Sequence, residues 1–238
     1  MSFFIFVIPF ILLVIIIKQS FNRYASGLRE RPGYILWFAT QIIRFKGWSN
    51  ESYCLSTNDL VSNDQSGYLS DRDIPKRRQS RPKMLRAVPH RQLTQQAPDE
   101  IMHEMHKYME SISIPKYGGQ TLNKDLLLRG PSILEYTGAY GIFLPNVDQK
   151  LACRSEVGHI HSNDGSFHMT VHPADAKLLI EKQWAERFPL HGINLFNKIV
   201  LSDTFILIYA PQDEEELSIW KKTLHAAIDY NRKILETH

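Results

Sequence analysis

The chain begins with a long apolar run. Residues 2–17 carry no charge, and the basic residues Lys18, Arg23, Arg29 and Arg31 follow closely. A helix over this run would span about 24 Å at about 1.5 Å per residue, and local thinning of a bilayer can make up the difference from a core of about 30 Å. We therefore expect residues 1–20 to form a single-pass transmembrane anchor. The positive-inside rule then predicts a cytosolic domain, with the endoplasmic reticulum as the expected membrane. A cleaved signal peptide is the weaker alternative, because no basic residue precedes the run.

Residues 21–95 show no pattern of an independent core. The apolar patch Tyr34–Phe45 (YILWFATQIIRF) is too short to cross a membrane, and it predicts either an interfacial helix or a helix packed on the domain. Residues 49–70 are polar and predict a loop. Seven basic residues crowd positions 76–91. They indicate a solvated basic linker or a contact with anionic membrane lipid.

Residues 96–238 alternate between helical and strand patterns. A helix is expected from Asp99, with Ile101, Met105 and Met109 on its apolar face. Strands are expected near residues 126–129, 140–144 and 204–210. Helices are expected over residues 174–184 and from the acidic residues 213–216, which would form a first turn. A hairpin is expected between the strand near residues 140–144 and the helix over residues 174–184. This order predicts an α+β fold, with an N-terminal membrane helix followed by a mostly antiparallel sheet that has helices packed on one side.

The segment 156–172 (EVGHIHSNDGSFHMTVH) is the most informative part of the chain. Asp164-Gly165 between two strand-like runs predicts a two-residue hairpin turn, with His161 opposite His168. Because side chains alternate along a strand, one face gathers polar groups and the other is apolar. The polar face holds His159, His161, His168, Thr170 and His172.

Imidazoles that share a face can act in three ways. They can serve as general bases near neutral pH, or bind a metal, for which His159, His161 and His168 are the candidate ligands. They can also be polar groups on a solvated face. Further along the chain, Arg187 could pair with an anionic oxygen and Trp184 could stack on a flat substrate. Ordinary packing is the alternative interpretation of both.

Composition narrows the choice of function. Hydrophobic residues make up 43% of the chain and charged residues 22%, which is typical of a globular protein. The net charge of +3 is too small to indicate nucleic-acid binding. Cys54 and Cys153 lie far apart, and so exclude a cysteine-rich zinc module.

Three stretches, in this order, resemble the fungal luciferase family: GHIHSNDGSFHMTVHPADAKLLIEKQW, AERFPL and FILIYAPQDEEEL. They correspond to the family's Glu and His-x-His hairpin, its Trp-containing turn with Arg and Pro-Leu, and its Tyr-Ala-Pro strand end before an acidic helix start. The resemblance covers about residues 120–232, and implies a luciferase-like α+β domain over residues 96–238. Departures from the family pattern fall at Gln183, Ala185, Phe188, His191 and Gln212.

The resemblance implies an oxygenase without a cofactor, with O2 as co-substrate. Its substrate would be a small apolar polyphenol or a pyrone of the 3-hydroxyhispidin type, which adds O2 and loses CO2 to leave an excited product. The implied catalytic residues are His159, His161, His168, His172 and Arg187, with His159 or His161 as the base. The implied substrate-binding residues are Glu156, Thr170, Trp184 and Tyr209. A metal-dependent enzyme and a non-catalytic binding protein are the alternative functions, because fold does not fix function.

Overall fold

We analysed a computed structural model of the chain. It describes residues 2–25, 33–60, 66–86, 89–115, 126–135, 139–145, 155–192, 194–195, 198–199 and 201–236. Cys153, Arg29 and Arg31 lie outside the described residues, whereas Cys54 is a buried free thiol.

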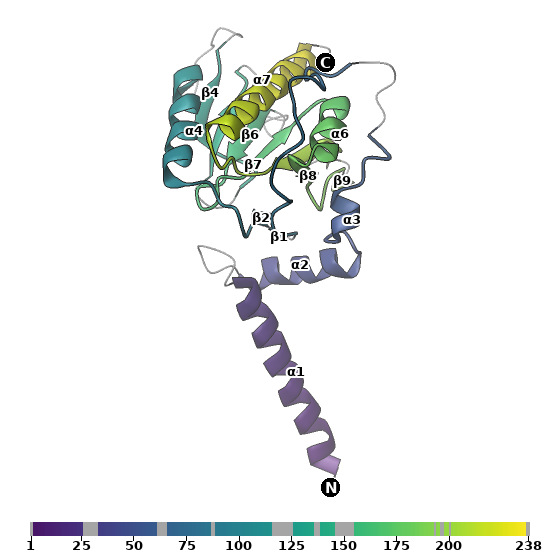
Figure 1. Ribbon diagram of the computed structural model, residues 1–238. Coiled ribbons are helices and arrows are strands. Elements are labelled where there is room, and N and C mark those ends of the chain that lie inside the picture. Colours follow the sequence, from purple (N-terminus) through teal and green to yellow (C-terminus); the bar gives the residue numbers. More distant parts are fainter. Residues whose placement is uncertain are drawn as a thin grey trace.

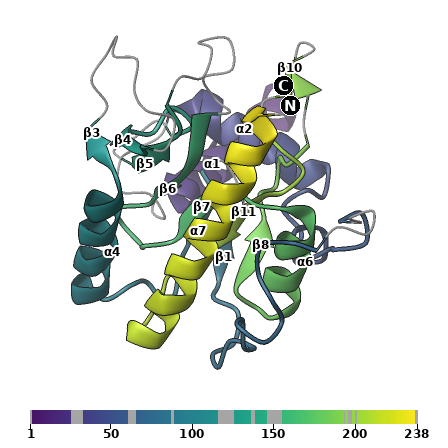
Figure 2. The ribbon, with the colours of Figure 1, turned by 90° about the horizontal axis from the view of Figure 1, so that it is seen from above.

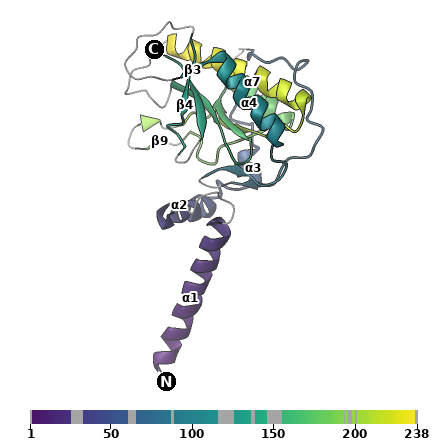
Figure 3. The same ribbon diagram turned by 90° about the vertical axis from the view of Figure 1, so that its left-hand side faces the viewer.

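Two helices precede the main body of the protein. Helix α1 (Ser2–Ala25) extends away from the rest of the molecule as a single rod, and α2 (Tyr34–Phe45) lies across its inner end (Figure 1, Figure 3). The Phe21 ring stacks on Tyr34 with centroids 4.2 Å apart, and Trp37 donates to the Ser20 hydroxyl at 3.3 Å. The last turns of α1 are therefore packed against α2.

The expected transmembrane anchor, and the membrane localisation that depended on it, are wrong. Of the helices in the described residues, none combines the length and the apolar character needed to cross a bilayer. The helix does run beyond the apolar segment, but its continuation from Lys18 is polar and its end packs on α2. The uninterrupted apolar part is about 24 Å long, short of the hydrocarbon core of about 30 Å.

A mixed sheet organises the rest of the chain. Its seven strands lie in the order β3-β4-β5-β6-β7-β11-β8. They are β3 (Ile114–Pro115), β4 (Leu128–Pro131), β5 (Tyr140–Phe143), β6 (Glu156–Ile160), β7 (Phe167–Thr170), β8 (Ala185–Arg187) and β11 (Phe205–Ile208). Only the β3–β4 pair is parallel among these strands. The chain is therefore α+β, and the long-range pairing places β11, from near the end of the chain, beside β7.

The hairpin register differs from the expected one by two residues. His159, not His161, faces His168 across the β6–β7 pair. The chain reverses over residues 161–166, where the His161 N–H donates to the Ser166 carbonyl at 2.9 Å. The two-residue turn is wrong because Asp164 accepts hydrogen bonds from the Ser166 amide and hydroxyl, which holds a wider loop. A shift of two residues keeps His159 and His168 on the same face, because the period of a strand is two. A β-bulge in β6 next to Gly158 breaks the alternation, so Val157 joins the apolar core and Glu156 bonds His159.

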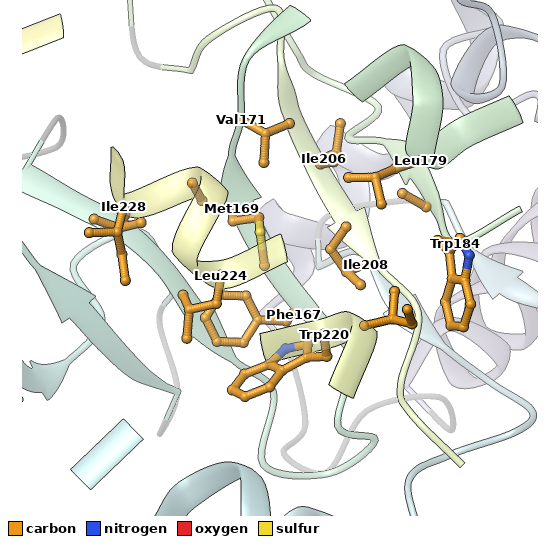
Figure 4. Close-up of a cluster of buried hydrophobic side chains, with 14 of the residues drawn as sticks. Phe167, Met169, Val171, Leu179, Trp184, Ile206, Ile208, Trp220, Leu224 and Ile228 are labelled. Atoms are coloured by element: carbon orange, nitrogen blue, oxygen red, sulfur yellow. The ribbon is translucent and has the colours of Figure 1, made fainter. Parts of the chain in front are cut away.

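Helices cover the apolar face of the sheet. Helix α7 (Glu214–Glu236) crosses it, with α4 (Asp99–Ile112) packed against α7 and α6 (Pro173–Glu181) beside β8 (Figure 2). Phe167 and Met169 of β7 meet Trp220 and Leu224 of α7 in this layer (Figure 4). The Phe167 and Trp220 rings lie 5.4 Å apart, edge to face. Because this layer takes up the apolar side chains of the hairpin, its polar side chains face the other way.

The segment that sequence patterns present as a loop and a basic linker packs on the domain. Its residues 68–77 reach α6 and α7, and its residues 86, 90 and 91 lie on the polar face of the sheet. It contains the short helix α3 (Glu51–Cys54) and the two-stranded β1 (Met84–Leu85) and β2 (Arg91–Gln92). Three of its basic residues donate to carboxylates of the domain: Arg77 to Glu216, Arg86 to Glu186 and Arg91 to Glu135. The small pair β9 (Asn194–Leu195) and β10 (Lys198–Ile199) completes the described strands.

Candidate functional site

A row of paired residues crosses the sheet on its polar face. From β5 to β8 the paired positions are Gly141, His159, His168, Leu207 and Glu186. His161 lies just beyond the end of β6, with its ring 5.2 Å from that of His159 and 4.9 Å from that of His168. His90, which precedes β2, brings a fourth ring 5.4 Å from His168. These four histidines, here called the histidine cluster, are only 1–2% exposed.

His159 is held by a carboxylate. Its Nδ1 lies 2.7 Å from Oε1 of Glu156, which also accepts from the Ser132 hydroxyl at 2.7 Å, while its Oε2 accepts from the Ile133 amide at 2.8 Å. Three donors around Glu156 match an ionised carboxylate, so Nδ1 of His159 carries a proton, and in the neutral ring the lone pair lies on Nε2. That Nε2 atom is buried without a hydrogen-bond partner, with Glu135 3.6 Å away.

The charges around His159 favour its protonated form. Burial by itself lowers the pKa of His159, but the adjacent carboxylates of Glu135 and Glu156 outweigh burial and raise that pKa above its ordinary value of 6.5. A neutral imidazole with one free nitrogen, poised between two carboxylates, is suited to taking up a proton.

His161 has no free nitrogen. The Ser166 hydroxyl donates to Asp164 at 2.7 Å, so it must accept from Nδ1 of His161, which lies 2.8 Å away. At the other side of the ring, Nε2 accepts from Arg91 at 3.0 Å. Burial, together with the Arg91 charge, holds the pKa of His161 well below its usual range. Of the two residues expected to be the base, only His159 therefore retains an available nitrogen.

The remaining two histidines face aromatic side chains. The His168 ring stacks on Phe205 at 4.8 Å, and burial holds its pKa well below the usual range, which keeps it neutral. His90 lies 5.8 Å from the Phe188 ring and contacts Glu186 through Nε2 at 2.7 Å. The cluster thus has an apolar lining at its β11 side and carboxylates at its margins.

One set of side chains has the donors of a metal site. Glu135, His159 and His161 each offer one atom, and these atoms lie within 4.8 Å of one another. Two histidines and a carboxylate suit iron or zinc. However, Arg91 donates to Glu135 at 2.6 Å and to His161 at 3.0 Å, so its guanidinium already engages two of the three. A cation at this point would have to displace Arg91.

The structure brings His159, His161 and His168 together, as the sequence predicts, and a β-bulge in β6 adds Glu156 to them. It places the other predicted residues elsewhere. His172 caps α6 and packs on Tyr68 and Tyr230. Thr170 follows on β7, where its carbonyl accepts from Asn231 of α7. Neither residue has a described contact with the cluster.

Trp184, predicted to stack on the substrate, and Arg187, predicted to pair with an anionic oxygen, also have their partners away from the cluster. Trp184 belongs to the buried apolar cluster, where it lies apart from Trp220 and Leu224 of α7 (Figure 4), and it donates to the Pro75 carbonyl at 2.6 Å. Arg187 donates to Asp59 at 2.5 Å and to His191 at 2.9 Å. Tyr209 reaches the site only indirectly, through its hydroxyl bond to Glu186 at 3.1 Å.

Sequence reasoning missed four members of the site. They are His90, Arg91, Glu135 and Glu186, and three of these belong to segments without a periodic pattern. The only available signal was the cluster of basic residues at positions 76–91, which sequence alone presents as a surface feature. These four residues reach the site only because segments that are distant along the chain fold next to each other.

Comparison with known proteins gives a consistent result. The family model for the luciferase domain matches residues 154–227. The chain is 30% identical over 88 residues to luciferases of Armillaria gallica and Armillaria mellea, a match that covers 37% of this chain and 32% of each relative. It is 24% identical over 170 residues to the luciferase of Neonothopanus nambi, covering 66% of this chain and 61% of that protein.

The matched part of the chain thus spans about a third of the Armillaria luciferases. No solved structure matches the chain significantly. The matched residues include His159, His161 and His168, which carry the geometry described above. The resemblance to the fungal luciferase family is therefore confirmed, and it rests on the luciferase domain at residues 154–227.

Proposed function

We propose that this protein is a luciferase-like oxygenase that oxidises a hydroxylated pyrone with O2, with His159 as the general base. The observation that carries the proposal is the buried Nε2 atom of His159, which has no hydrogen-bond partner while Glu156 fixes the proton on Nδ1. An unsatisfied buried nitrogen costs stability, so its presence here supports a role in binding or chemistry.

In this reaction, Nε2 of His159 takes the proton of a ring hydroxyl. The resulting imidazolium lies between Glu156 at 2.7 Å and Glu135 at 3.6 Å, so both carboxylates stabilise it. The electron pair left on the pyrone makes an electron-rich enolate, which can donate electrons to O2. The peroxide formed then closes onto the ring, and loss of CO2 releases the energy for an excited product.

The surroundings of the cluster suit such an intermediate. The four rings are at most 2% exposed, and Phe188 and Phe205 line their β11 side. Exclusion of water protects a peroxide from hydrolysis and strengthens nearby electrostatic interactions. The same burial means that a pyrone can bind only if these side chains move apart. Arg91, rather than Arg187, is the guanidinium that lies beside the histidines.

A metal-dependent reaction is the second candidate, favoured by the arrangement of Glu135, His159 and His161. Its weakness is the pair of hydrogen bonds from Arg91 to Glu135 and His161. The two candidates make different predictions, since a general base needs no metal and a metal-bound His159 could not accept a proton at Nε2.

The test uses the full chain with 3-hydroxyhispidin, with oxygen uptake and light recorded together in the presence and absence of a chelator. We expect chelator-resistant oxygen uptake that falls at least 100-fold in His159→Gln, because a positioned base contributes about 10²–10⁴-fold. The exposed His103 provides a matched control, and His103→Gln should retain the rate. Uptake abolished by chelator and restored by a metal would favour the second candidate, and equal rates in both variants would refute His159 as the base.

A further inference from the structure

A series of hydrogen bonds, here called the hydrogen-bond relay, links the β6–β7 turn to the histidine cluster. Asp164 accepts from the Ser166 hydroxyl at 2.7 Å, and the Ser166 oxygen lies 2.8 Å from Nδ1 of His161. On the far side of that ring, Nε2 of His161 lies 3.0 Å from Nη1 of Arg91. All four residues are at most 5% exposed, so these bonds form away from bulk water.

The relay can carry its protons in one direction only. A guanidinium donates and never accepts, so Nε2 of His161 must accept from Arg91, and the proton of the neutral ring lies on Nδ1. Nδ1 then donates to Ser166, whose own hydroxyl proton must point to Asp164. Asp164 also accepts from the backbone amide of Gln92 at 2.9 Å, so the same side chain holds the residue next to Arg91.

The position of Arg91 decides where Glu135 lies. The second amino group of Arg91, Nη2, donates to Oε1 of Glu135 at 2.6 Å. The other oxygen, Oε2, then lies 3.6 Å from Nε2 of His159 and 3.6 Å from Nε2 of His161. A hydrogen bond between nitrogen and oxygen is normally about 2.7–3.2 Å long. Glu135 therefore stops short of a hydrogen bond with either ring.

This distance matters because a general base needs a free lone pair. If Glu135 moved into hydrogen-bond contact with Nε2 of His159, that nitrogen would have to carry a proton. Since Nδ1 of His159 already donates to Glu156 at 2.7 Å, the ring would be an imidazolium before any substrate bound. At 3.6 Å, Glu135 is near enough to stabilise the imidazolium once it forms, yet leaves Nε2 without a partner beforehand.

We propose that Asp164 and Ser166 are positioning residues for the base. By fixing the tautomer of His161 they hold Arg91 in place, and Arg91 keeps Glu135 away from the free nitrogen of the base. This inference rests on the proposed function, because it assumes that the base is His159. The hairpin turn then has a role in the chemistry in addition to reversing the direction of the chain.

The test removes one hydroxyl group from the relay. Ser166→Ala deletes the link between Asp164 and His161 but keeps the turn, because the backbone amide at position 166 still donates to Asp164. Ser113→Ala is the matched control, since Ser113 is also buried and its hydroxyl donates to a backbone carbonyl of α4. A loss of stability common to both variants therefore reports only the loss of a buried hydrogen bond.

The kinetic readout is oxygen uptake with 3-hydroxyhispidin. In Ser166→Ala we expect kcat to fall at least about tenfold, because the base is altered, while KM changes less than about twofold, because no substrate contact is removed. Ser113→Ala should keep both constants. Equal losses of kcat in the two variants would show a general structural effect and would overturn the inference.

The spectroscopic readout uses ¹⁵N-labelled histidines and does not depend on turnover. Wild-type His161 should carry its proton on Nδ1. In Ser166→Ala this proton loses its acceptor, so the Nε2–H form should appear and displace Arg91. The released Glu135 then has the two Nε2 atoms nearest to it, and the Nε2 signal of His159 should shift toward that of a protonated nitrogen.

The outcomes separate the inference from the proposed function. Wild-type His161 with its proton on Nε2 would overturn the relay, and this measurement needs no variant. An unchanged His159 signal or an unchanged kcat in Ser166→Ala would overturn the positioning role. If the signals change as expected but no protein consumes O2, the control of His159 by the relay is supported and the oxygenase is refuted.

Discussion

Glu156→Gln is the sharpest test of the proposed base. The oxygens of Glu156 accept from His159, Ser132 and Ile133, so no orientation of a glutamine amide can accept from all three. If the amide nitrogen of the new glutamine faces Ile133, its NH2 group meets the Ile133 N–H, and two hydrogen-bond donors lie opposite each other. If it faces His159, the imidazole must accept at Nδ1 and carry its proton on Nε2, which removes the lone pair that the reaction needs.

The size of the effect follows from the charge that is lost. A hydrogen bond to a charged group contributes about 1.5–3 kcal/mol, and one pKa unit corresponds to about 1.36 kcal/mol. The substitution weakens one such bond and should therefore lower the pKa of His159, with Glu135 still 3.6 Å away. With the wrong tautomer favoured, kcat should fall by about 10²–10⁴-fold.

The direction of the pH dependence is fixed by the raised pKa of His159. A base acts only when neutral, so the wild-type rate should rise as the pH passes a midpoint above 6.5. The contribution of His159 to stability changes in the opposite direction. A histidine whose pKa is higher in the folded than in the unfolded protein stabilises the fold fully at a pH below its unfolded-state pKa. This stabilisation is lost as the pH rises through its folded-state pKa. In Glu156→Gln both transitions should move to lower pH.

Oxygen uptake across pH and an NMR titration of the His159 ring provide the two readouts, and the second does not depend on turnover. Glu110→Gln is the matched control, because it removes a carboxylate from an exposed position. If Glu156→Gln titrated with the wild-type midpoint at His159, the carboxylate would not control this ring, and the assignment of the base would fail.

Three further predictions concern the fold and the metal question. A Cβ at Gly158 would overlap the backbone oxygen of His168, so Gly158→Ala should lower the free energy of unfolding by at least about 1–3 kcal/mol in denaturant unfolding. In the control Gly33→Ala, the new Cβ meets no atom within 4 Å, and stability should change by less than about 0.5 kcal/mol. Equal losses in the two variants would show that the β6–β7 packing is looser than described. Trp220→Ala, deep under α7, should cost about 3–5 kcal/mol by the same assay, and a loss below about 1 kcal/mol would contradict its place in the core. Arg91→Met frees two candidate ligands, so calorimetry should show Zn²⁺ binding at least about tenfold tighter than in the wild type; unchanged affinity would mean that Arg91 does not compete with a cation.

Local patterns were enough to predict much of the domain. The expected helix from Asp99 is α4, the expected strand near residues 140–144 is β5, and acidic residues form the first turn of α7 as expected. Each of these depends on interactions within a few residues, such as apolar periodicity or charge at a helix end, so the sequence carries the information directly. Residues 185–187 are different: they form β8 because β11 pairs with them, and nothing in the three residues alone predicts a strand.

The sequence by itself determined that His159 and His168 share a face, because the alternation of a strand survives a register shift of two residues. It did not determine the β-bulge that brings Glu156 to His159, or the packing of His172 on Tyr230. It could not determine the register, since Asp164 widens the turn through bonds to Ser166. Nor could it determine the partners of each imidazole. Glu135, Glu186, Arg91 and His90 reach the cluster from distant parts of the chain, and these contacts decide which nitrogen is protonated and which is free. Protonation depends on atoms a few ångströms apart in space, and only the tertiary structure sets those distances.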